Sequence, residues 1–172
     1  MKAIFKLAFA FAALLSFAAC SDVPMPYEQP GDNPKGDEPS TETVAKGTGT
    51  QADPYNVTAA LKVINALASG EVTPTAIYVK GAVKQIKQIE TEQYGNANYY
   101  ITDDGNNEIY IFQSYYLGNR KFTASDKLEV GDTVVVYGKF TNYMGNTPET
   151  VGKGTSYIYS LNGKTEGGTT PD

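Results

Sequence analysis

The stretch "NYYITDDGNNEIYIFQSYYLG", residues 98–118, decides the fold. Two segments rich in β-branched and aromatic residues, 97–103 and 108–114, flank a cluster of Asp, Gly and Asn, and this pattern predicts a β-hairpin. Because successive side chains of a strand point to opposite faces, each segment divides into an inward and an outward set. The inward set is predicted to be Tyr99, Ile101, Ile109 and Ile111. The outward set is predicted to be Tyr100, Tyr110 and Phe112.

Further strands are expected on both sides of this hairpin. Segment 76–90 alternates between two faces, and Gly81 in its middle indicates a bend or a bulge. Two more strands are predicted over 133–140 and 155–163. The hairpin and these segments together make five strands, so the domain is expected to be mainly β.

One helix is expected before the strands. Apolar residues recur at helical spacing over residues 57–68, and Ser69-Gly70 ends the pattern. Asn56 or Thr58 has the side chain that an N-terminal helix cap requires. We therefore predict one amphipathic helix that precedes the first long strand.

The first twenty residues indicate where the protein acts. Lys2 and Lys6 precede an apolar run over 7–19, the order of a secretory signal, and the run is short for a membrane-spanning helix. It ends at Cys20, the single Cys of the chain, in a pattern that resembles a bacterial lipobox. We predict a lipoprotein signal peptide over 1–19 and a lipid anchor on Cys20. The anchor would hold the protein on a membrane of the cell envelope, expected to be the outer membrane. Two alternatives are the periplasmic face and the cell-surface face of that membrane.

Residues 20–46 are expected to form a disordered, acidic, Pro-rich tether. The part after Cys20 holds five Pro and six acidic residues and has no apolar periodicity. Without the signal peptide the chain keeps 12 of its 14 Lys and Arg against 19 Asp and Glu, a net charge of −7. This balance does not favour polyanions as partners. The folded domain is predicted over 47–164, and 165–172 as a flexible tail.

The composition argues against the common enzyme chemistries. The chain has no His and one Cys, which excludes a His-based catalytic triad and zinc sites built from Cys and His. The segment "DDGNNE" (103–108) is rich in side-chain oxygens but lacks the spacing of an EF-hand, so we interpret it as a hairpin turn rather than a calcium loop. We predict a protein that is not an enzyme and uses no metal and no cofactor.

The strand pattern resembles the OB-fold of nucleic-acid-binding modules. "LEVGDTVVVYGKF" (128–140) is similar to the fourth OB strand, in which a Gly-Asp turn launches the strand and a later Gly bends it. The "GTGTxxDPY" entry, the "VKG" strand and the "YYITDDG" hairpin also resemble small OB-like lipoproteins of gut-type Gram-negative anaerobes. The resemblance covers about residues 47–163. It implies a five-stranded OB-like barrel with one preceding α-helix.

In OB modules that bind nucleic acid, the face of the second and third strands holds the ligand, and bases stack there on aromatic rings. The resemblance therefore points to a candidate ligand-binding face made by Tyr78, Lys80, Lys84, Tyr100, Tyr110 and Phe112, with Lys87 continuing its cationic edge. The expected ligand is single-stranded nucleic acid, a glycan or a peptide. Two alternatives stay open: the rings pack only against one another, or the helix covers them. A second hypothesis is a structural or accessory lipoprotein that docks to an envelope protein complex.

Overall fold

The computed structural model describes residues 43–166. The predicted signal peptide, Cys20, most of the tether and most of the tail lie outside the described residues. Backbone groups before the predicted domain start belong to the fold, because Lys46 N donates to Asn56 Oδ1 over 2.9 Å and Asn56 Nδ2 donates to the Val44 carbonyl over 2.9 Å. Val44 and Lys46, which the prediction placed in the tether, are therefore hydrogen-bonded to Asn56 of the folded domain.

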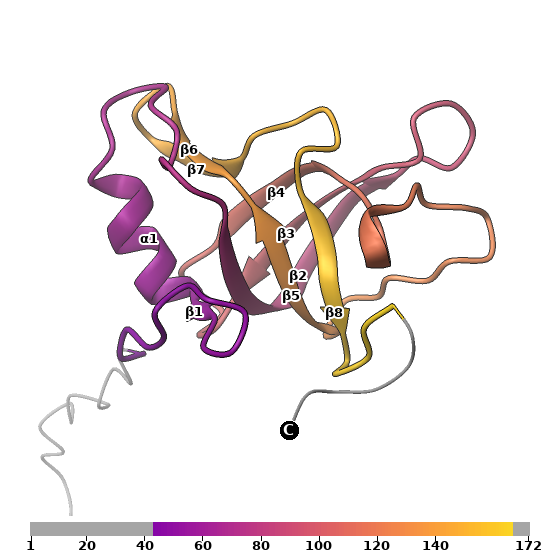
Figure 1. Cartoon of the computed structure of the whole chain (residues 1–172), viewed down its shortest axis with the longest axis horizontal. Helices are drawn as coiled ribbons and strands as arrows, with labels where there is room; N and C mark the ends of the chain where they lie inside the picture. Colours follow the sequence, from indigo (N-terminus) through magenta and orange to yellow (C-terminus); the bar gives the residue numbers. More distant parts are fainter. Residues whose placement is uncertain (1–42, 167–172) are drawn as a thin grey trace, which may run out of the picture. The chain divides into compact units, whose positions relative to one another are not determined.

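The described chain is mainly β and has one α-helix, as predicted (Figure 1). The helix α1 spans Val57–Asn65, and a short 3-10 turn, η1, spans Leu117–Asn119. The eight strands are β1 (Tyr55–Asn56), β2 (Ile77–Ile89), β3 (Ala97–Thr102), β4 (Ile109–Ser114), β5 (Thr133–Gly138), β6 (Phe140–Tyr143), β7 (Thr147–Thr150) and β8 (Tyr157–Leu161).

The strands form one eight-stranded open sheet in the order β6-β7-β4-β3-β2-β5-β8, with β1 parallel beside β2. The prediction of a barrel with five strands was wrong in its strand count, because β1, β6 and β7 were not expected. The strand predicted to run to Phe140 ends at Gly138, and Phe140 starts the separate strand β6. Strand β6 then turns back into β7 through Met144 and Gly145, which both have positive φ.

The residue that follows β4 approaches β8, the last strand of the sheet, at one point. Tyr115, directly after β4, donates its N–H to the Ser156 carbonyl over 2.9 Å and accepts from the Ile158 N–H over 3.0 Å. These bonds form a single parallel bridge between Tyr115 and Tyr157. The contact between β4 and β8 is thus one isolated bridge rather than a continuous ladder.

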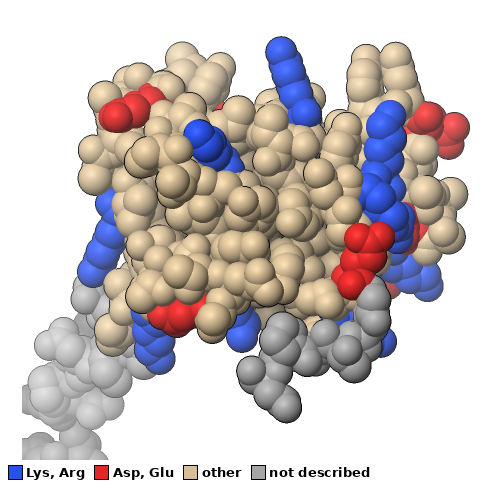
Figure 2. Space-filling model, viewed as in Figure 1, with Lys and Arg blue, Asp and Glu red and all other residues tan. Residues whose placement is uncertain are grey.

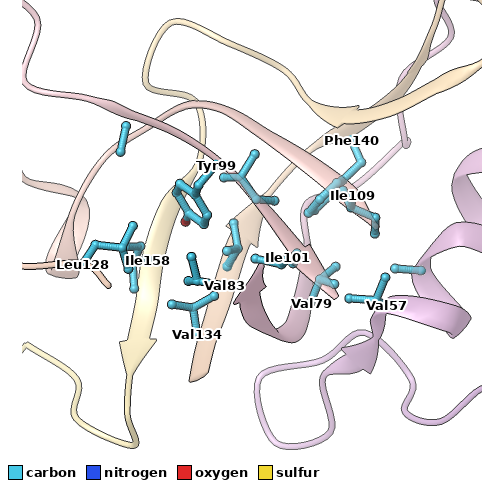
Figure 3. Packing of buried hydrophobic residues seen from close by; sticks show 14 of the residues in the cluster. Val57, Val79, Val83, Tyr99, Ile101, Ile109, Leu128, Val134, Phe140 and Ile158 are labelled. Atoms are coloured by element: carbon cyan, nitrogen blue, oxygen red, sulfur yellow. The ribbon is translucent and has the colours of Figure 1, made fainter. Parts of the chain in front are cut away.

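The hairpin of β3 and β4 contributes the centre of the core. Tyr99, Ile101, Ile109 and Ile111 have no exposed surface, so the inward half of the predicted alternation is confirmed. They pack with residues of β2, β5, β8 and the helix, and Figure 3 shows Val57 of α1 beside Val79 at one end of this cluster. Burial of these side chains is the main stabilising term of the fold.

Helix α1 closes one end of this core. Asn56 caps it by accepting the Ala59 N–H over 3.0 Å, so one of the two predicted capping residues has that role. The helix ends at Asn65, three residues before the predicted end, and Leu67 N–H turns back to the Ile64 carbonyl. Its contacts are with β1, β2, β6 and β7 (Figure 1). Within residues 43–166, no helix is long and apolar enough to cross a bilayer.

One glycine of β2 permits a close contact between elements. A Cβ on Gly81 would lie 2.9 Å from Val57 Cγ2 and 3.0 Å from the Thr102 carbonyl oxygen, so this glycine admits the start of α1. The predicted bend or bulge is found further along β2, at register shifts between Val83 and Gln85 and between Ile86 and Gln88. The mid-strand glycine is therefore explained by close approach and not by a bulge at its own position.

Candidate functional site

The outward residues of the hairpin form a continuous row of three rings. The ring centroids of Tyr100 and Tyr110 are 4.8 Å apart, and those of Tyr110 and Phe112 are 5.8 Å apart. All three side chains are half-buried, so part of each ring meets solvent. We name this row the aromatic strip. It sits on two paired strands and is therefore held rigidly.

The aromatic strip on β3 and β4 is bordered by β7 and the loop that follows it, whereas helix α1 makes its main contacts with β1, β2, β6 and β7. Tyr110 pairs in register with Glu149 of β7. Burial raises the pKa of Glu149, and burial with the nearby Tyr100 and Glu149 raises the pKa of Tyr110. Phe112 lies against Gly152, where an added Cβ would come within 2.6 Å of the ring. The strip thus has one covered edge and one open face.

Cations are sparse around the strip in the described part of the chain. Lys87 Nζ lies 6.0 Å from the centroid of the Tyr100 ring, at the outer limit of a cation–π contact. Lys84, a predicted site residue, forms an ion pair with Glu108 over 2.7 Å, which neutralises its charge. Lys87, which was predicted only to continue the edge, is therefore the cation that faces the strip.

Tyr78 and Lys80 do not join the aromatic strip, so the six predicted residues are not brought together in one group. Strand β2 is long and changes partner along its length: Gln85 pairs with Tyr100 of β3, whereas Tyr78 pairs with Tyr137 of β5. Tyr78 lies seven residues before Gln85, roughly 23 Å at about 3.3 Å per residue. The two halves of β2 therefore present their outward side chains to different neighbours.

Tyr78 belongs to a second cluster of rings on β2, β5 and β8. Its centroid lies 4.5 Å from that of Tyr137 and 5.1 Å from that of Tyr159, and Tyr137 lies 5.4 Å from Tyr157. Burial, with the neighbouring tyrosines, raises the pKa values of Tyr78 and Tyr157. Sequence reasoning missed the other three rings of this cluster, Tyr137, Tyr157 and Tyr159. The alternation in "VVVYG" and "SYIYS" places all of them on the outward face and was the available signal.

Lys80 is exposed and lies between two adjoining depressions in the surface. One has a volume of about 460 Å³ and reaches Asp103 and Gly105 of the β3–β4 turn. The other has a volume of about 430 Å³ and reaches Gln51 and Tyr159. Both are lined by Lys80 and Thr133. We call the two together the Lys80 groove.

The acidic turn of the hairpin uses its carboxylates for structure. Asp103 accepts the Thr58 N–H over 2.9 Å and the Thr58 hydroxyl over 3.2 Å. Asp104 accepts the backbone N–H groups of Asn106 and Asn107 over 2.8 and 2.7 Å. In the part of the chain that the structure describes, no group of three or more acidic, Cys or His residues is placed to hold a metal ion. The turn is thus organised by its own hydrogen bonds and by the start of α1.

No protein-family model matches the chain, and no curated protein matches it in sequence.

Proposed function

We propose that the protein is a lipid-anchored, OB-like binding module of the cell envelope, without enzymatic activity, and that it binds its ligand on the aromatic strip. The single observation that carries this proposal is the continuous, partly exposed row of Tyr100, Tyr110 and Phe112 on one rigid hairpin. A sequence-tolerant stacking platform needs such a row of rings. The anchor part of the proposal rests on residues 1–20 of the sequence.

The OB-like part is supported by the order in which the strands pair. The segment β4-β3-β2-β5-β8 is antiparallel throughout, and the bridge at Tyr115 and Tyr157 brings its two outer strands together. A five-stranded, partly open barrel has this kind of return contact. The remaining strands β1, β6 and β7 would be additions at the edges of that barrel.

The charges around the aromatic strip favour two of the three expected ligand classes over the third. Nucleic acids bind through several Lys or Arg side chains that neutralise phosphates, but Lys84 is paired, and among residues 43–166 only Lys87 lies over a ring of the strip. Figure 2 shows broad uncharged areas between the cations on one face of the described region. A sugar ring or an aromatic peptide side chain therefore fits the strip better than single-stranded nucleic acid.

The aromatic strip should be essential for ligand binding. We expect that changing Tyr100, Tyr110 and Phe112 together to Ala weakens ligand binding at least about tenfold, because each stacked ring contributes roughly 1–3 kcal/mol. The measurement is calorimetric titration of the full-length chain with a neutral oligosaccharide, a tyrosine-rich peptide and a single-stranded oligonucleotide. Tyr94→Ala is the control, since Tyr94 is 58% exposed and lies outside the strip. Equal binding by the triple variant, confirmed as folded by circular dichroism, would refute the strip as the site.

A second candidate function is favoured by one exposed apolar surface. Tyr143 is 51% exposed and Met144 is 71% exposed at the tip of the β6–β7 hairpin. Val72 is 38% exposed and is bridged to Thr141 of β6. Exposed apolar groups gathered in this way are typical of protein contact sites. The chain would then be a structural or accessory lipoprotein that docks to an envelope protein complex.

This docking function predicts a specific cross-link. In intact cells, chemical cross-linking and pull-down of the full-length chain should recover a protein partner that is lost when Tyr143 and Met144 are both changed to Ser. The matched control is Tyr94→Ser, a comparably exposed ring elsewhere. Recovery of the same partner from both variants would exclude the hairpin tip as the docking surface.

A further inference from the structure

The floor of the Lys80 groove is formed by outward residues of β2, β5 and β8. In the register of β2, β5 and β8, Lys80 pairs with Val135, and Val135 pairs with Ser160, so these three lie in one row across the sheet. Ala82 and Thr133 form the next row on the same face of the sheet, beyond the pair Gly81 and Val134. The walls come from segment 51–54 and Tyr159 on one side and from the β3–β4 turn on the other. Each half is within the size range of small-molecule sites, which is about 300–1,000 Å³.

Lys80 is the one cationic side chain among the residues that line this groove. Lys80 is exposed and forms no ion pair with any Asp or Glu of residues 43–166. Asp103, the one carboxylate in the lining, accepts two hydrogen bonds from Thr58 and lines only the depression at the β3–β4 turn, so Lys80 is the one charged side chain of the depression beside Tyr159. The neighbouring Lys84 forms an ion pair with Glu108. A single uncommitted ammonium group suits one carboxylate and not the repeated phosphates of a nucleic acid.

The rest of the lining suits a flat ring with hydroxyl groups. Tyr159 is held edge-to-face against Tyr78, at an interplanar angle of 86°, and lines the groove. Tyrosine combines an apolar ring with a polar tip, which suits a ring ligand that is apolar on one face and polar at its rim. The neutral side chains of Thr133, Ser160 and Gln51 supply both hydrogen-bond donors and acceptors.

We infer that the Lys80 groove is a second binding site and that it takes a carboxylated sugar, such as a uronic acid unit of an acidic glycan. The carboxylate pairs with Lys80, and the sugar ring packs on the aliphatic floor beside Tyr159. The two joined depressions give room for more than one ring. The groove lies on β2, β5 and β8, so this inference does not rest on the function proposed for the strip on β3 and β4.

The test compares trigalacturonate with its methyl ester, which removes the charge and keeps the rings. Calorimetric titration of the full-length chain should show binding of the acid, and Lys80→Gln should weaken it at least about tenfold, the effect of one charge-assisted hydrogen bond. The ester should bind the unmodified chain as weakly as the acid binds Lys80→Gln. Lys80→Arg should retain affinity within about threefold.

Two matched variants show whether binding depends on the Lys80 groove itself. Lys139→Gln removes an exposed charge outside the groove and should leave the affinity unchanged. The triple Ala variant of the aromatic strip should also bind trigalacturonate normally. The inference is overturned if acid and ester bind equally, if Lys80→Gln has no effect, or if no binding occurs at millimolar acid. Tighter binding of a tri-glutamate peptide or of a short oligonucleotide would also overturn it.

Discussion

Replacing Ile101 with Ala should lower the free energy of unfolding by about 2–5 kcal/mol. Ile101 has no exposed surface and lies opposite Ile109 of β4 and Val83 of β2, both of which are also in the core. The substitution removes three carbon atoms from a site enclosed on both sides by paired strands, so the cavity cannot collapse easily. Urea denaturation of the full-length chain, followed by circular dichroism, measures the effect.

The neighbouring residue provides the control for this prediction. Tyr100 precedes Ile101 in β3 but points to the outer face, where it contacts mainly Tyr110. Tyr100→Ala should therefore lower the free energy of unfolding by only about 1 kcal/mol, the scale of a cross-strand pair. A cost for Tyr100→Ala equal to that of Ile101→Ala would mean that the two faces of the hairpin are assigned incorrectly.

Gly138→Val should be comparably damaging, with a loss of about 3 kcal/mol or more in the free energy of unfolding. A Cβ at Gly138 would lie 2.6 Å from Ser156 Cβ and 3.0 Å from Ser156 Cα. The obstacle includes backbone, so the segment leading into β8 must move. That movement would disturb the pairing of β5 with β8 and the nearby bridge at Tyr115.

Gly70→Asn is the matched control, measured by the same urea titration. Gly70 has a φ of 76° and nothing within 4 Å of its Cβ position. Asn tolerates this left-handed conformation, so we expect a loss below about 1 kcal/mol. If Gly138→Val were as mild as this control, close packing of Ser156 against Gly138 could not be a condition for the fold.

The hairpin was predictable from the sequence because its signal is local. Alternation with period two over β3 and β4 separates buried Tyr99 and Ile101 from outward Tyr100 without knowledge of the rest of the chain. The capping residue Asn56 is local in the same sense, because its side chain binds a backbone group three residues away.

The number of strands was not predictable in the same way. The turn between β6 and β7 places Met144 at a φ of 54°, a conformation that L-residues other than Asn and Asp rarely adopt. Gly145-Asn146 is an ordinary turn signal, but the strands beside it have only four residues each, and Pro148 inside β7 argues against a strand at that place. The pairing of β7 with β4 is parallel and joins Tyr110 to Glu149, a contact between positions far apart in the chain.

The sequence predicted the grouping of the three hairpin rings, but not the separation of Tyr78 and Lys80 from them. Alternation says which face a residue of β2 points to, but it does not say which strand lies beside it. Two register shifts in β2 and its change of partner separate Tyr78 from Tyr100. The grouping of Tyr78 with Tyr137 and Tyr159 depends on that change of partner, so it needed the three-dimensional structure.

Mapping of the ligand contacts tests the proposed strip by a route independent of mutation. The full-length chain, labelled with 15N and 13C, is titrated with the member of the ligand panel that binds, and chemical shifts are followed residue by residue. We predict that the largest changes fall on Tyr100, Tyr110 and Phe112, with smaller changes at Lys87 and Glu149. Changes confined to the hairpin tip at Tyr143 and Met144, or no binding by any member of the panel, would contradict the proposal that the strip is the binding site.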